Sequence, residues 1–203
     1  MVVDGELTFI EDTHQYLLDG VLVPSVSEIL HFIFPDKYKG VSKETLNKKA
    51  KYGSTLHEYI EMFEKGRYED LPELDLYQKL SFKQYCKLVS RYDIKVLEQE
   101  KMVHFEDYYA GRFDMIANIN GKKCLCDIKT TATLDIEYLS WQLSLYEFAY
   151  GTRFKKLYAI YLPKKELGAL VEIPRKQKRQ ITSMLRKFRK EQKKYEENFE
   201  FNN

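Results

Sequence analysis

Two aspartates on either side of an Asn-Gly pair form a pattern suited to binding a divalent cation. Asn120-Gly121 separates two strand-like runs, and this dipeptide favours a two-residue hairpin loop. Such a loop pairs Ile119 with Lys122 across the turn. Counted back along both strands, the same register places Asp114 opposite Asp127. Directly opposed side chains lie roughly 5 Å apart and like charges there are destabilising, whereas a cation between the two carboxylates would make the pairing favourable.

A lysine completes the pattern. Side chains alternate between the faces of a strand, so Lys129 shares a face with Asp127. A metal held by two carboxylates can lower the pKa of a bound water and neutralise charge on phosphoryl oxygens. A neighbouring ammonium can orient that water or stabilise the transition state. The three residues therefore predict phosphodiester hydrolysis. The alternative is an exposed hairpin end whose charges simply face solvent.

The other face of this hairpin is expected to be apolar and to fix its register. The pairs there would be Phe113 with Ile128, Met115 with Cys126, and Ala117 with Cys124. Burial of such a face resists strand slippage, because a shift of one residue moves every side chain to the other face.

A histidine is expected near the start of a helix. Residues 42–52 predict one helix that ends at Gly53, and Thr55 with Glu58 matches a capping box for the next helix. His57 would then lie in the first turn of that helix, with Gly66 in the C-terminal capping position. An N-terminal-turn histidine that only packs or caps is the alternative to a metal ligand.

The remaining pattern predicts a mixed α/β fold in one domain. Residues 7–23 suggest a hairpin with Asp19-Gly20 at its turn, followed by a short helix through 28–30 that stops near Pro35. The other expected elements are helices over 74–92, 138–150 and the basic carboxy-terminal segment, and strands over 94–105, 109–119, 122–130, 157–162 and 169–173. We expect an amino-terminal hairpin and helices over 1–52, a core over 53–174 and a basic helix over 175–203.

The basic helix stands out from a chain whose net charge is only +2. Ten lysines and arginines between 175 and 194 face a single acid, Glu191, which favours binding to a polyanion. A solvated helix face is the alternative. Ile181, Leu185, Phe188 and Tyr195 would form its apolar side.

Composition and cysteine usage suggest a cytoplasmic protein. The 203 residues are 44% hydrophobic, which suits a compact core, and no apolar run of about 18 residues could cross a membrane. Three cysteines cannot form a closed disulfide framework, so we expect them to be reduced. If the protein is encoded by a phage, the compartment would be the host cytoplasm.

Four motifs in this order resemble the PD-(D/E)XK nuclease superfamily, and its RecB-like branch above all. They are Gly53 to His57, Gly111 to Asp114, Asp127 to Thr130, and Gln142 to Tyr146. The segment from His14 to Leu30 is similar to the amino-terminal stretch of phage members.

The resemblance implies a restriction-endonuclease-like core, with a mixed central sheet that contains a three-strand meander flanked by helices. It implies Mg²⁺ or Mn²⁺ as cofactor, held by His57, Asp114, Asp127 and the main-chain carbonyl of Ile128, with Lys129 acting on the nucleophilic water. It also implies DNA contacts by Gln142 and Tyr146, for which a core role of Tyr146 is an equal alternative. We expect further DNA contacts from three lysines of the basic helix: Lys187, Lys190 and Lys194.

The implied activity is that of a deoxyribonuclease, in particular an exonuclease of DNA recombination, repair or replication, with a protein partner from such a pathway. Some members of the RecB-like branch carry an iron–sulfur cluster on four cysteines; with three cysteines here, we expect no cluster. The resemblance leaves open Glu58, Glu61, Glu98 and Glu100.

Several rival functions remain open at this level. They are an inactive nuclease-like DNA-binding module, a structure-specific endonuclease, a metallohydrolase with another substrate, and a structural phage or plasmid protein. A zinc peptidase is poorly supported, because His57 has no second histidine at the spacing of such sites.

Overall fold

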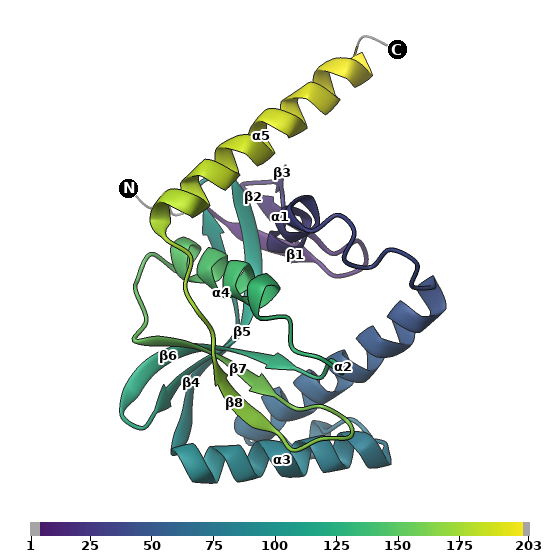
Figure 1. Ribbon diagram of the computed structural model, residues 1–203, viewed down its shortest axis with the longest axis vertical. Coiled ribbons are helices and arrows are strands. Elements are labelled where there is room, and N and C mark those ends of the chain that lie inside the picture. The colour runs from purple at the N-terminus through teal and green to yellow at the C-terminus, as the bar shows by residue number, and fades with distance from the viewer. Residues whose placement is uncertain (1–4, 201–203) are drawn as a thin grey trace.

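The fold is a mixed α/β arrangement of two sheets and their flanking helices. The computed structural model describes the backbone of residues 5–200 and the side chains of residues 5–194. The chain forms a three-stranded antiparallel sheet and then a five-stranded mixed sheet (Figure 1). None of the helices in this described part combines the length and apolar character needed to span a membrane.

The five-stranded sheet has the order β4-β5-β6-β7-β8. Its strands are β4 (Ile94–Phe105), β5 (Tyr109–Ile119), β6 (Lys122–Lys129), β7 (Lys156–Tyr161) and β8 (Ala169–Glu172). The first three form the expected antiparallel meander. The pairing of β6 with β7 is parallel, and the connection between them contains α4 (Ile136–Tyr150), as a parallel crossover requires.

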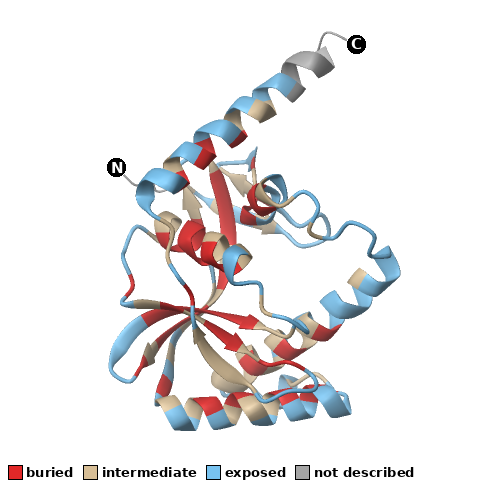
Figure 2. Cartoon of the chain, in the orientation of Figure 1, coloured by how far each residue is buried: buried red, intermediate tan, exposed pale blue. Residues whose placement is uncertain are grey.

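Helices cover both faces of this sheet, giving three layers. On one face, α1 (Val26–Ile33), α4 and α5 (Lys178–Glu200) contribute to a core that includes Ile116 and Leu125. On the other face, α2 (Lys43–Glu64) and α3 (Leu76–Tyr92) pack on Met115 and Cys126. The buried residues follow the strands and the helix faces turned toward them (Figure 2). A short 3₁₀ helix, Tyr68–Asp70, connects α2 to α3.

The small sheet comprises β1 (Leu7–Ile10), β2 (Gln15–Leu18) and β3 (Val21–Val23). The predicted turn at Asp19-Gly20 is confirmed, because both residues have positive φ between β2 and β3, but the predicted hairpin is a three-stranded sheet with a further turn between β1 and β2. Ser25 then caps α1 through a reciprocal capping box with Glu28. Tyr16 and Val23 pack on Ala110, so this small sheet packs against the start of β5.

The hairpin between β5 and β6 has the predicted register. Asn120 and Gly121 have φ of 48° and 76°, as a type I′ turn requires. Pairing runs from Ile119 with Lys122 to Met115 with Cys126. These two strands therefore approach each other as the Asn-Gly spacing predicts.

The predicted pairing of Phe113 with Ile128 is wrong. Phe113 lies in the core beneath α4, whereas Ile128 lies in the core beneath α2 and α3. On β4, the residue between the partners of Phe113 and Met115 is Glu100, whose φ is +48°. The left-handed residue interrupts the pleat of β4 at this level, and on β5 Phe113 and Met115, two residues apart, lie in different cores.

The predicted boundary between two helices at Gly53 is also wrong. Helix α2 runs unbroken from Lys43 to Glu64, with Ser42 rather than Thr55 as its N-cap. A glycine within a helix costs only about 1 kcal/mol. Here a Cβ at Gly53 would lie 3.2 Å from Thr130 Oγ1, so the glycine allows α2 to approach the end of β6. Gly66, with a φ of 70°, follows the helix as predicted.

The other predicted helices and strands agree with the structure within two residues at each end, except the basic helix, expected from 175, which begins at Lys178. Ile181, Leu185 and Phe188 are buried on the apolar side of α5, as expected. The side chain of Tyr195 lies outside the described residues.

Candidate active site

Asp114 joins β5 to β6 where the regular ladder ends. One oxygen of its carboxylate, Oδ2, accepts a hydrogen bond of 2.6 Å from the backbone N–H of Ile128. The side chain thus takes the place of a backbone carbonyl beyond the last regular pair, Met115 with Cys126. A charge-assisted bond of this kind is stronger than a neutral one and fixes the carboxylate beside the main chain of β6.

Asp127 and Lys129 form a close ion pair at the same end of β6. Lys129 Nζ lies 2.5 Å from Asp127 Oδ2, and their side chains are 22% and 2% exposed. Burial raises the pKa of Asp127, which the Lys129 ammonium opposes and the Asp114 carboxylate reinforces. Burial works against the charge of Lys129, but Asp127 and Asp114 together raise its pKa. The structure therefore brings the two predicted aspartates and the lysine into one electrostatic cluster.

His57 reaches this cluster from α2. Its Nδ1 lies 3.6 Å from Asp114 Oδ2. It stands one helical turn after Gly53, on the same face of the helix, so the close approach at Gly53 also directs His57 toward β5. Its place is in the middle of a long helix rather than in a first turn, which leaves no capping role for the imidazole.

Glu100, whose role the sequence left open, is a further member. His57, Glu100 and Asp114 each offer one potential ligand atom, and these three atoms lie within 4.8 Å of one another. Burial, with the charge of Asp114 next, raises the pKa of Glu100 to about 7, while Arg112 opposes the shift. Arg112 Nε contacts Glu100 Oε2 at 2.9 Å. A carboxyl group held beside another carboxylate gains from a cation between them.

The donor set fits a hard or borderline divalent cation. Imidazole nitrogen and carboxylate oxygens suit Mn²⁺, and carboxylate oxygens suit Mg²⁺. Asp127 Oδ2 is instead buried against Lys129 Nζ, 2.5 Å away, and among the described residues the ligand atoms that gather within 4.8 Å are those of His57, Glu100 and Asp114. The main chain of Ile128 lies beside Asp114, because its N–H donates a hydrogen bond to the Asp114 carboxylate.

The other open glutamates differ in their surroundings. Glu61 lies one turn after His57, forms an ion pair with Lys65 and adds to the raised pKa of Glu100. Glu98 instead accepts hydrogen bonds from Lys101 and Tyr150. Its carboxylate is thereby held outside the cluster.

Gln142 and Tyr146 lie behind the acids rather than on an open surface. Tyr146 is 6% exposed and belongs to the core beneath α4. A Cβ at Gly111 would lie 2.7 Å from Tyr146 Cε1, so Gly111 makes room for this ring. Burial raises the pKa of Tyr146, and Asp127 and Asp114 add to the shift. Oε1 of Gln142 is buried without a hydrogen-bond partner among the described residues. This placement favours packing over base stacking for Tyr146.

The three lysines of α5 form a separate surface. Lys187, Lys190 and Lys194 are exposed, and α5 runs across the end of the protein opposite α3 (Figure 1). Arg189 is held by Asp107 through two hydrogen bonds, which fixes this helix against the turn between β4 and β5.

Comparison with known proteins adds little. No family model matches the chain, and neither does any curated protein. A solved structure described as "Crystal structure of SSO0001" is similar, with a TM-score of 0.36 and 18% identity over 79% of this chain and 81% of that one. A likeness of this size carries no argument about the fold or the function.

Replacing His57 by alanine is expected to weaken binding of Mn²⁺ at least about tenfold and of Mg²⁺ less, because imidazole is the better ligand for Mn²⁺. Titration calorimetry of both ions measures the change. His14, which is exposed in the turn between β1 and β2, provides the control variant His14→Ala. Equal affinities of wild type and His57→Ala for both ions would remove His57 from the site.

Replacing Glu100 by glutamine is expected to stabilise the metal-free protein at pH 8. The pKa of Glu100 is raised from 4.5 to about 7 on folding, so its contribution to stability is complete below about pH 4.5 and is lost as the pH rises through 7. Thermal unfolding in EDTA should therefore show a gain of a few degrees at pH 8 and almost none at pH 4.5. The same variant should bind Mn²⁺ more weakly. A variant less stable than wild type at pH 8 would contradict the expected crowding of charges.

Proposed function

We propose that the protein is a Mg²⁺- or Mn²⁺-dependent deoxyribonuclease that hydrolyses phosphodiester bonds. The observation that carries the proposal is the convergence of Asp114, Asp127 and Lys129 at one end of β6, with His57 beside them. The order of motifs along the chain supports a restriction-endonuclease-like core of the RecB-like branch of the PD-(D/E)XK superfamily.

The residues of the chain divide the work. His57, Asp114, Asp127 and the carbonyl of Ile128 would hold the cation, and Glu100, whose carboxylate gathers with the ligand atoms of His57 and Asp114, would be a further ligand. The cation, when bound, lowers the pKa of a water and neutralises charge on the phosphoryl group. Lys129 orients that water and stabilises the developing charge with its ammonium. Asp127 holds Lys129 in position through their ion pair.

A retained acid cluster favours an enzyme over an inactive binding module. Asp127 is 1% exposed and its carboxylate lies near that of Asp114. Burying neighbouring carboxylates is costly, and a module that only binds DNA has no need of that cost. Acid-lined sites also repel phosphate unless a cation is present, which accords with a metal-dependent reaction.

Digestion of labelled DNA tests the proposal. Linear and circular substrates, single- and double-stranded, are incubated with the protein in Mg²⁺, in Mn²⁺ and in EDTA. We expect cleavage with either metal and none in EDTA. Loss of linear DNA while circles survive would identify an exonuclease, and nicking or cutting of circles would identify an endonuclease. Failure to cut any substrate with either ion would refute the proposed activity.

Neutralising three lysines of α5 is expected to weaken DNA binding and flatten its salt dependence. Contacts of lysines with phosphates release counterions, and each contact adds about 0.7 to 0.9 to the slope of log affinity against log salt. Substituting Lys187, Lys190 and Lys194 by glutamine should therefore reduce the slope by about 2, as measured by fluorescence anisotropy.

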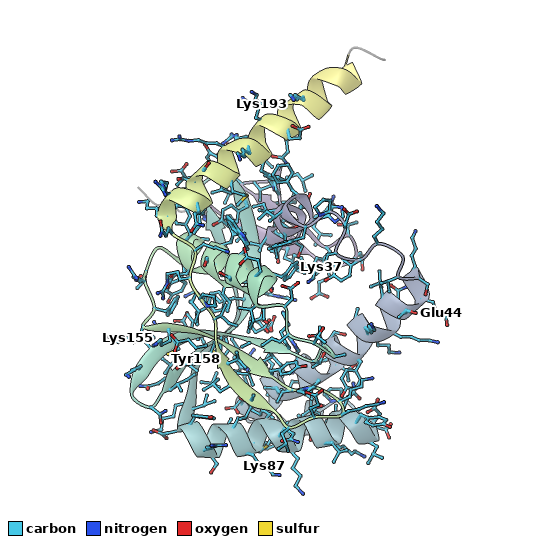
Figure 3. The ribbon with its side chains drawn as sticks, in the orientation of Figure 1. Lys37, Glu44, Lys87, Lys155, Tyr158 and Lys193 are labelled. Atoms are coloured by element: carbon cyan, nitrogen blue, oxygen red, sulfur yellow. The ribbon has the colours of Figure 1, made fainter. Side chains whose placement is uncertain are left out.

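The matched control is the glutamine triple variant of Lys79, Lys83 and Lys87, three exposed lysines of α3. Helices α3 and α5 lie at opposite ends of the molecule, as the labelled side chains of Lys87 and Lys193 show (Figure 3). Gln142→Ala should lower cleavage while the slope changes little, because the amide carries no charge. If the α5 variant keeps the full slope, α5 is only a solvated face.

A further inference from the structure

A second cavity lies away from the acid cluster, between the end of α4 and the start of α5. It has a volume of about 590 Å³ and is lined by the last two turns of α4, the connection from α4 to β7 and the segment that enters α5. A neighbouring hollow of about 560 Å³ shares Thr152, Arg153 and Arg175 with it, so the two adjoin as one cleft. Figure 1 shows the start of α5 beside the carboxy-terminal end of α4. Cavities of this size are typical of sites for small ligands.

The lining of this cleft is strongly basic. Six of its residues are cations and, within the described part of the chain, only Glu147 is an acid. The cations are Lys123, Arg153, Lys155, Arg175, Lys176 and Lys178. Three of the six form ion pairs with acids, whereas Arg153, Lys155 and Lys178 are exposed and have no such partner among residues 5–194. The cleft therefore carries a surplus of positive charge that favours an anionic ligand.

Buried hydrogen bonds hold the walls of the cleft in place. Arg175 donates to both carboxylate oxygens of Glu147, through Nε at 2.5 Å and Nη2 at 3.0 Å, and Nη2 also reaches the carbonyl of Phe154 at 2.8 Å. The N–H of Lys176 donates to Ser144 Oγ at 2.9 Å. Nη1 of Arg175 takes no part in these bonds. Walls that are ordered before binding lower the entropic cost of holding a ligand.

Two aromatic rings line the same cavity as these cations. Phe105 and Phe148 are both half-buried, and their ring centroids lie 4.6 Å apart. Lys178 Nζ lies 6.0 Å from the centroid of the Phe148 ring, so a cation stands next to an aromatic wall. A nucleobase can stack on such a ring while a cation binds its phosphate. An acidic peptide would engage the cations but would make no use of the rings.

The cleft is separate from the proposed active site. Lys123 lies at the start of β6 and Lys129 at its end, which places them about 20 Å apart at roughly 3.3 Å per residue. Figure 3 shows Lys155 on the side of the molecule opposite Glu44 of α2, the helix that carries His57. A small ligand in the cleft would therefore not reach the acid cluster.

We infer that this cleft binds a nucleoside phosphate, with Arg153 and Lys178 on the phosphate and the ring of Phe148 against the base. The planar fork of an arginine fits phosphate oxygens with two parallel hydrogen bonds, and the lysine adds a point charge. The ligand is a free nucleotide or one nucleotide of a nucleic-acid strand, since both present the same chemistry. The inference does not depend on the reaction proposed at the acid cluster.

Fluorescence anisotropy of a labelled single-stranded tetranucleotide tests the site. Binding is measured in EDTA, because the metal-free acid cluster repels phosphate. Replacing Arg153 and Lys178 together by glutamine should weaken binding at least about tenfold and lower the slope of log affinity against log salt by about 1.4. Phe148→Leu should weaken binding about 5- to 150-fold with an unchanged slope, because it removes a ring and no charge.

Two controls separate binding from folding and from bulk charge. Phe148→Tyr keeps the ring and should retain wild-type affinity, whereas a loss in Phe148→Leu is counted only for protein with a cooperative thermal transition. The double glutamine variant of Lys83 and Lys87, exposed on α3, removes the same charge elsewhere and should bind as wild type does. Displacement of the tetranucleotide by dAMP would show that a free nucleotide suffices, and displacement by unlabelled oligonucleotide alone would show that the site takes a strand.

Three results would overturn the inference. They are wild-type affinity and slope in the Arg153 and Lys178 double variant, wild-type affinity in folded Phe148→Leu, and equal displacement by polyglutamate, which would indicate an acidic protein partner. Cleavage is not part of this readout. A protein that binds through the cleft but cuts no DNA would refute the nuclease and keep the site, whereas cleavage with unaltered binding by the cleft variants would refute the site alone.

Discussion

Replacing Lys129 by alanine is expected to lower the rate of DNA cleavage at least about a hundredfold, which is the usual effect of losing one transition-state stabiliser. Lys129 is the cation nearest the buried Asp127 carboxylate, with its Nζ 2.5 Å from Oδ2. The rate is measured on end-labelled DNA with saturating Mn²⁺. Lys156→Ala provides the control, because Lys156 is also a lysine on a strand that forms an ion pair, in its case with Glu172.

Two roles of Lys129 can be separated by pH. Besides acting on the water, the ammonium lowers the pKa of Asp127, so its loss would raise that pKa further and leave Asp127 protonated over a wider range. If keeping Asp127 ionised were its whole role, raising the pH would restore cleavage by Lys129→Ala. We expect no recovery between pH 7 and pH 9, since the water would still lack its orienting group.

Folding must be checked in the same variant. Breaking a buried ion pair costs about 3 to 5 kcal/mol when one partner stays charged, so the rate of Lys129→Ala is compared only for protein that circular dichroism shows to be folded. Lys129→Gln retains most of the side-chain volume and serves as a second variant. Near-normal cleavage by either folded variant would refute the proposed role of Lys129.

The sequence predicted the register of the β5–β6 hairpin because one local feature determines it. A type I′ turn needs positive φ at both central residues, and Asn120 and Gly121 meet that need with little strain. Counting along the strands reaches Asp114 one residue beyond the last regular pair, Met115 with Cys126. The side chain then adds a bond that counting could not reveal, the contact with the N–H of Ile128.

The role of Glu100 was left open because the turn between β4 and β5 has no such signal. Phe105 pairs with Tyr109, and the same register carried back along both strands brings Glu100 opposite Asp114. The three residues between them, Glu106, Asp107 and Tyr108, include no Asn-Gly pair, so the loop length could not be assigned. With that length known, the argument used for Asp127 would have found Glu100 as well.

The error at Gly53 arose from tertiary packing. Glycine followed by Thr55 and Glu58 is a local signature of a helix end and a new start, yet α2 continues through all three. The gain comes from contact with a distant residue, Thr130 at the end of β6. No pattern within the helix reports that contact, although it is what brings His57 to Asp114.

Replacing Asp114 by asparagine is expected to reduce Mn²⁺ affinity at least about a hundredfold while preserving the fold. The amide oxygen can still accept the hydrogen bond of the Ile128 N–H, so the substitution removes the charge and little else. Asp114→Ala removes both. It should therefore cost a further 1 to 3 kcal/mol or so of stability, because a backbone donor is left unsatisfied.

The order of thermal stabilities is expected to reverse between EDTA and Mn²⁺. Without metal, Asp114 faces the carboxyl groups of Asp127 and Glu100, and Asp114→Asn should match or exceed wild type because that repulsion is relieved. With millimolar Mn²⁺, wild type should become the more stable protein, since a ligand that binds only the folded state stabilises it. Asp107→Asn, at the surface pair with Arg189, should show no metal-dependent change relative to wild type. If Mn²⁺ raises the melting temperature of Asp114→Asn as much as that of wild type, Asp114 contributes nothing to the cation site, and the charge cluster must have another purpose.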